Sequence, residues 1–172
     1  NKNNKLDLQE MINFINWERK NIRYRYDNEN EESPKKESLV GDGRPGPEYR
    51  QTPYETFKER AGDCEDFATF EAAFFNYWGK PSFVGGVNTE SEILDHAVSI
   101  ILMSKEEIDS ITSAIDSCVY YYEFKEGEKI FAYGIKEIPA GNYLLLESCF
   151  STACERKKYD LFDIVPVDKP YG

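Results

Sequence analysis

The chain begins with apolar residues at the spacing of an amphipathic helix. The apolar positions are Leu8, Met11, Ile12 and Ile15. They fall on one side of a helix, which predicts this element over residues 7–20. Asp7 and Glu10 have the spacing of a capping box at its start. Residues 23–26 then alternate between arginine and tyrosine, which predicts a short strand or extended segment.

A second helix is predicted at roughly residues 64–78, where apolar side chains again fall on one face. This stripe consists of Phe67, Phe70, Phe74, Phe75 and Trp78. Asp63 is a suitable N-cap, and Asp66 stands at the third helical position. The glycine and proline that follow the stripe provide a stop signal. Cys64 is therefore expected in the first turn of this helix.

Short apolar runs separated by polar turns predict mainly strands in the second half of the chain. The expected strands are residues 82–87, 97–103, 119–124, 130–138 and 143–147. A helix is predicted at about residues 104–117, because Ser104 and Glu107 form a capping box ahead of Ile108 and Ile111. Helices followed by a largely antiparallel sheet indicate the α+β class.

Length and composition suit a single globular domain over residues 1–172. The 172 residues are 40% hydrophobic and 15% aromatic, enough to fill a core. A polar stretch at about residues 27–48, rich in Glu, Lys, Pro and Gly, predicts a long loop. The net charge of −11 disfavours nucleic acid as a partner, because phosphate contacts need basic patches. No apolar run approaches the ~18–20 residues of a membrane span.

The four cysteines and the single histidine do not have the spacing of a zinc site, since no CxxC pair occurs. Cys118 follows the apolar stripe of the helix predicted at about residues 104–117, and it is expected in the core. Cys149 and Cys154 are spaced for a disulfide in an oxidising compartment, with free thiols as the alternative. The N-terminus is polar and lacks a methionine, which suggests processing. These features lean towards an extracytoplasmic location.

Cys64 and His96 have the chemistry of a nucleophile and its general base. A thiol in the first turn of a helix lies where the helix dipole favours the thiolate, so its pKa should fall. His96 is the only histidine, so any imidazole base for Cys64 must come from it. It stands at the start of a predicted strand and alternates in phase with Val98 and Ile100, which directs it towards a partly buried side.

Glu147 is the candidate for the acid that orients the histidine. It ends the apolar run 143–146, and a carboxylate there needs a partner such as His96. Each residue alone has a simpler interpretation. Cys64 could be a small core residue, His96 a structural histidine and Glu147 a solvated strand end. The ordered combination supports the catalytic interpretation.

Three segments carry a resemblance to a known family. The run 51–56 with Gly62–Ala68 (Gly-Asp-Cys-Glu-Asp-Phe-Ala) resembles the nucleophile segment of bacterial transglutaminase-like proteins. Residues 95–98 (Asp-His-Ala-Val) resemble their histidine segment, and residues 143–148 resemble the strand that delivers an aspartate. The resemblance implies a papain-like α+β core, with the nucleophile helix packed on an antiparallel sheet. Glu147 replaces the usual aspartate, which is a departure from the family pattern.

The resemblance implies a cysteine peptidase or related enzyme acting on peptide or amide bonds of a protein or peptide substrate. Its Cys64–His96–Glu147 triad would form a thioester acyl-enzyme. The alternative is a protein-binding module with weak or no catalysis. Glu147 in place of aspartate and the acidic residues around Cys64 favour this alternative modestly.

The sequence does not decide two further features of the site, the oxyanion donors and a calcium site. The backbone N–H of Cys64 and the side chain of Gln51 are candidate oxyanion donors, with Tyr49 or Tyr54 as other sources. Gln51 could equally bond local backbone. No cofactor is expected, although Asp63 and Glu65 match calcium ligands in a related group of periplasmic cysteine proteases.

Overall fold

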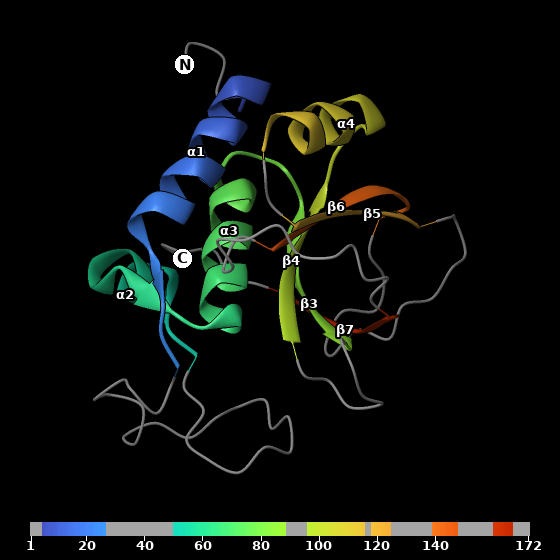
Figure 1. Cartoon of the computed structure of the whole chain (residues 1–172). Coiled ribbons are helices and arrows are strands. Elements are labelled where there is room, and N and C mark those ends of the chain that lie inside the picture. The colour runs from blue at the N-terminus through green and yellow to red at the C-terminus, as the bar shows by residue number, and fades with distance from the viewer. Residues whose placement is uncertain are drawn as a thin grey trace.

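Helices cover one face of a five-stranded antiparallel sheet in the computed structural model (Figure 1). The structure describes residues 5–26, 50–88, 96–115, 118–124, 139–147 and 160–166. The strand order is β5-β6-β4-β3-β7, and every neighbouring pair is antiparallel. This arrangement confirms the α+β class.

The first helix, α1 (Leu8–Asn21), forms where the apolar spacing predicted it. The Asp7 side chain accepts a hydrogen bond from the Glu10 backbone at 2.8 Å, and the Glu10 carboxylate accepts one from Asp7 N–H at 2.9 Å. This capping box satisfies two of the donors that a helix start leaves open. The short strand β1 (Arg23–Tyr24) follows and pairs in parallel with β2 (Ala61–Gly62).

A short helix, α2 (Pro53–Glu59), precedes the nucleophile segment, and no helix was expected here. Thr52 is its N-cap and forms a capping box with Glu55, while Pro53 occupies the first turn. The helix ends at Arg60, whose φ of 55° puts it in the left-handed region. This turn leads the chain directly into β2 and the start of the next helix.

The central helix, α3 (Cys64–Tyr77), confirms the prediction for residues 64–78 to within one residue. It packs against β4 and β3. The fourth helix, α4 (Lys105–Ala114), also begins at its predicted capping box of Ser104 and Glu107. It buries Ile108 and Ile111 against the same core as α1.

Four predicted strands are confirmed with ends shifted by one or two residues. They are β3 (Ser82–Asn88), β4 (His96–Leu102), β5 (Cys118–Phe124) and β6 (Gly141–Glu147). The fifth strand of the sheet, β7 (Asp160–Pro166), was not expected. It pairs with β3 at the edge, so a segment close to the C-terminus belongs to the same sheet as the helix-covered core.

The main core lies between the sheet and the three helices α1, α3 and α4. Its buried members include Met11, Ile15, Phe75, Ile101 and Ile111. No helix within the described ranges is long and apolar enough to cross a bilayer. The predicted loop at 27–48, the predicted strand at 130–138, Cys149 and Cys154 lie outside the described residues, as does the side chain of Cys118.

Candidate active site

Cys64 is the first residue of α3, and its position is fixed by the capping box around it. The Asp63 carboxylate accepts hydrogen bonds from the backbone N–H groups of Glu65 and Asp66, at 3.1 and 3.3 Å. In return, the Asp66 carboxylate accepts one from Asp63 N–H at 3.1 Å. The thiol of Cys64 is half-buried. It therefore stands at a well-formed helix N-terminus, where the dipole favours an anion.

The Cys64 side chain packs on the side of α3 that faces the sheet. It contacts the cluster formed by Ala68 and Ala72 of α3 with Val84 of β3 and Ala97 of β4. Ala97 is the neighbour of His96, the first residue of β4. The fold therefore brings Cys64 beside the start of the strand that carries the histidine.

His96 is half-buried, and its Nε2 atom is buried. The residues of β4 that contact the helix side are Ala97, Ser99 and Ile101. His96 alternates with them and belongs to the set with Val98 and Ile100. Both Val98 and Ile100 are buried, so both faces of β4 are covered.

Glu147 ends β6, the strand next to β4. The paired residues of β4 and β6 end at Ser99 and Leu146, and continuing this register by one residue would set Glu147 opposite Val98. Val98 is two residues from His96, so the backbone register makes Glu147 and His96 diagonal neighbours. On its other side, Glu147 pairs with Cys118 of β5.

A sequence model of the transglutaminase-like domain matches residues 1–133. The chain belongs to this family. The match covers Cys64 and His96 and ends before Glu147. No curated protein matches the chain.

In this transglutaminase-like domain, Gln51 forms hydrogen bonds with residues that precede and follow Cys64 in the sequence. It is 2% exposed, and its side-chain amide donates to Ala61 O and to Asp66 Oδ2, both at 2.8 Å. Its Oε1 atom accepts from Arg25 at 3.0 Å. Both amide hydrogens are therefore in use, and none is left for an oxyanion. The geometry favours local bonding for Gln51 over the oxyanion role.

Tyr54 lies on α2 with 64% of its surface exposed, and Tyr49 is outside the described residues. The Asp63 carboxylate, a candidate calcium ligand with Glu65, is occupied as the N-cap. Within the described ranges, no three acidic, histidine or cysteine side chains gather as a metal site.

Two structural features were not expected from the sequence. The first is a buried contact between α3 and β4, in which the Ser99 hydroxyl donates to the Glu71 carboxylate. Ser99 is 0% and Glu71 1% exposed. The sequence did contain signals for this contact. Ser99 lies in an apolar strand and Glu71 lies among the apolar residues of a helix, and a polar side chain that is buried needs a hydrogen-bond partner.

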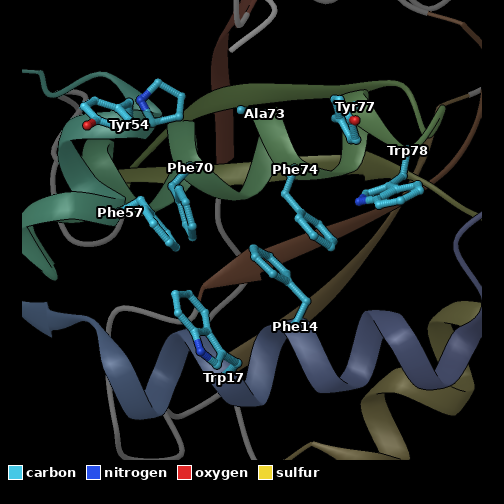
Figure 2. Close-up of a pocket in the computed structure, with 10 residues that line it drawn as sticks. Phe14, Trp17, Tyr54, Phe57, Phe70, Ala73, Phe74, Tyr77 and Trp78 are labelled. Atoms are coloured by element: carbon cyan, nitrogen blue, oxygen red, sulfur yellow. The ribbon is translucent and has the colours of Figure 1, made fainter. Parts of the chain in front are cut away.

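The second is an aromatic groove between α1 and α3, which reaches α2 (Figure 2). Its volume is about 740 Å³, and its walls include Trp17, Tyr54, Phe57, Phe70, Tyr77 and Trp78. The high aromatic content of the first 80 residues was the available signal. In the sequence alone, this content indicates a core and not a groove.

Proposed function

We propose that this domain is a thiol-dependent hydrolase or acyl transferase that acts on peptide or amide bonds. The Cys64 sulfur attacks the carbonyl carbon, and the amine leaves as the C–N bond breaks. His96 takes the thiol proton and delivers it to the departing amine. Water or a second amine then cleaves the thioester and restores the thiol.

The observation that carries this proposal is the position of Cys64 at the first residue of a capped helix. Such a position stabilises a thiolate, and the backbone N–H of a residue in the first turn has no intrahelical partner. That N–H is a candidate donor to the oxyanion that forms when Cys64 attacks. Cys64 packs against the cluster that contains Ala97, the neighbour of His96, which brings the start of β4 near the nucleophile. Alternation along β4 places His96 in the other set of side chains, so its role as the base rests on its position at the start of this strand.

Glu147 is proposed as the residue that orients the imidazole. The register of β4 and β6 supports this role by making the two positions diagonal neighbours. The extra methylene of glutamate gives its carboxylate more reach than the usual aspartate of the family. Its role in this chain is therefore to hold one tautomer and orientation of His96.

The second candidate function is a protein-binding module that keeps the fold without efficient catalysis. Three acidic residues, Asp63, Glu65 and Asp66, surround Cys64, and nearby negative charge disfavours a thiolate. Two of the three carboxylates are engaged in the capping box, which reduces but does not remove this effect. The aromatic groove also favours a binding role.

Selective alkylation separates these two functions. We expect iodoacetamide near neutral pH to modify Cys64 stoichiometrically in the folded protein, with peptide mapping to distinguish it from the other three cysteines. The Cys64→Ser variant is the control for site assignment. An inert Cys64 in folded protein would favour the binding module.

The proposed chemistry uses side chains and backbone N–H groups of the chain and requires no cofactor. Calcium binding at Asp63 and Glu65 is the alternative, since oxygen ligands suit this ion. It predicts that EGTA lowers the melting temperature or the alkylation rate of Cys64. Unchanged values after EGTA treatment would exclude a calcium requirement.

A further inference from the structure

The aromatic groove lies in the helical layer, between α1 and α3. Ten residues line it, eight of them aromatic and none charged. Phe14 and Trp17 of α1 pack against Phe70 and Phe74 of α3 along it, with the Phe14 and Phe74 rings stacked 3.6 Å apart, and α2 lies at one end and Trp78 at the other (Figure 2). Its 740 Å³ lies in the range of pockets that hold a ligand or a short peptide.

The exposed area of the groove sets the size of its occupant. Tyr54 is 64%, Phe57 45% and Tyr77 62% exposed. At ~200 Å² for a large aromatic side chain, these three rings offer roughly 350 Å². A stable dimer needs about 800 Å² from each partner. The groove therefore suits a short segment of another protein better than a second copy of this chain.

Hydrogen-bonding groups on the walls set the chemistry of the occupant. The two indole N–H groups, of Trp17 and Trp78, can only donate. In the part of the chain that the structure describes, neither donates to a protein group. Tyr54 adds an exposed hydroxyl. An occupant must therefore supply acceptors and apolar surface, and it needs no charge.

The floor of the groove is held in place before any partner binds. The guanidinium of Arg60 lies over the rings of Trp17 and Phe57, at 4.7 and 4.1 Å from their centroids. Such cation–π contacts fix aromatic rings at the surface. Trp17 and Phe57 also stack on each other, with centroids 6.0 Å apart. Preorganised rings lower the entropy lost on binding.

We propose that this groove binds a proline-rich, uncharged segment of a partner protein in the polyproline II conformation. Such a segment makes no internal hydrogen bonds, so all its carbonyl groups can accept from the indoles. Proline has no backbone N–H, so it needs no hydrogen-bond acceptor from the groove walls, which contain few acceptors. Aromatic-lined grooves favour this preformed, low-entropy conformation. An amphipathic helix already uses its carbonyls internally and would leave the indoles unbonded.

Tryptophan fluorescence reports on this groove selectively, because both tryptophans of the chain line it. The test is a titration of the full chain with a ten-residue proline peptide, beside a Gly-Ser peptide of equal length. We expect a saturable change in emission with the proline peptide only. No saturable change, or an equal response to the Gly-Ser peptide, would overturn the proposal.

Exposed tyrosines supply the variants for this test. Tyr54→Ala and Tyr77→Ala are each expected to weaken binding at least tenfold. Tyr26→Ala is the matched control, since Tyr26 is 61% exposed, lies outside the groove, and should bind within twofold of wild type. Unchanged affinity in both groove variants would overturn the proposal. So would tighter binding of an amphipathic helical peptide, or emission that varies with protein concentration alone, which indicates a second copy.

Discussion

Ser99 donates a hydrogen bond to Glu71 across the buried interface between β4 and α3. The Ser99 hydroxyl also lies 3.5 Å from the carbonyl oxygen of Leu146, so three elements meet at this point. α3 begins at Cys64 and β4 begins at His96. The bond therefore ties together the two elements that carry the proposed nucleophile and base.

Ser99→Ala should lower the free energy of unfolding by about 1–3 kcal/mol, because a buried carboxylate loses a hydrogen-bond donor. Urea denaturation measures this change. Ser113→Ala is the control, since the exposed Ser113 hydroxyl donates to a carbonyl on the surface of α4 and its loss should cost less than about 0.5 kcal/mol. Equal stability of the two variants would show that the Ser99 bond contributes little.

Gly62→Ala should disrupt the segment that leads into Cys64. A Cβ at residue 62 would lie 2.5 Å from Asp66 Cβ and 2.9 Å from Gln51 Nε2. Relieving this overlap should cost about 1–3 kcal/mol of stability, measured as a shift in the urea midpoint. Gly79→Asn is the comparison, because a Cβ there meets nothing within 4 Å and asparagine tolerates its φ of +81°. A Gly62→Ala variant as stable as Gly79→Asn would contradict the close packing.

Asp66→Asn should destabilise the domain by about 2–4 kcal/mol, since a buried carboxylate accepts several bonds that an amide cannot all accept. The donors are Gln51 N at 2.6 Å, Gln51 Nε2 at 2.8 Å and Asp63 N at 3.1 Å. Thermal and urea unfolding measure the loss. Asp109→Asn, on the exposed surface of α4, should change stability by less than about 0.5 kcal/mol. A similar small change in Asp66→Asn would show that this network is dispensable.

Tyr143 should ionise late in an alkaline titration. Burial raises the pKa of its phenol from 10.0 to about 12, and its hydroxyl donates to Pro139 O at 2.5 Å. Because the folded-state pKa is the higher one, its contribution to stability is complete below pH ~10 and is lost as pH rises towards 12. Absorbance of tyrosinate, compared between wild type and Tyr143→Phe, isolates this group. A difference spectrum with a midpoint near pH 10 would contradict the burial.

Local sequence signals were sufficient for most elements of the fold. Capping boxes at Asp7, Asp63 and Ser104 each mark a helix start that the structure confirms. The same signal was present at Thr52, with proline in the first turn, but α2 has only seven residues and little apolar periodicity. Periodicity is a weak guide for so short a helix.

Contacts distant in sequence account for what could not be predicted. The strand β7 is defined by its pairing with β3, more than 70 residues earlier, and its sequence alone gives no partner. Gln51 was a candidate either for an oxyanion donor or for local bonding, and only the structure shows that its amide donates to Ala61 and Asp66. The aromatic groove is lined by residues of α1, α2 and α3 together, which no residue pattern within one helix reveals.

For the candidate site, the sequence predicted where Cys64 and His96 lie along their helix and strand. Cys64 begins a helix and His96 begins a strand, as the capping and apolar patterns indicated. The packing of Cys64 against a cluster that includes Ala97 of β4 adds a relation between the two elements that spacing cannot supply.

The pH dependence of Cys64 alkylation in wild type and in His96→Ala tests the central proposal most directly. Peptide mapping must follow the rate at Cys64 alone, because the chain has four cysteines. If a thiolate–imidazolium pair forms, wild type reacts well below the free-thiol pKa of ~8.5, and the variant loses that advantage. If both proteins titrate alike near or above that value, His96 does not activate Cys64, and the catalytic account is contradicted.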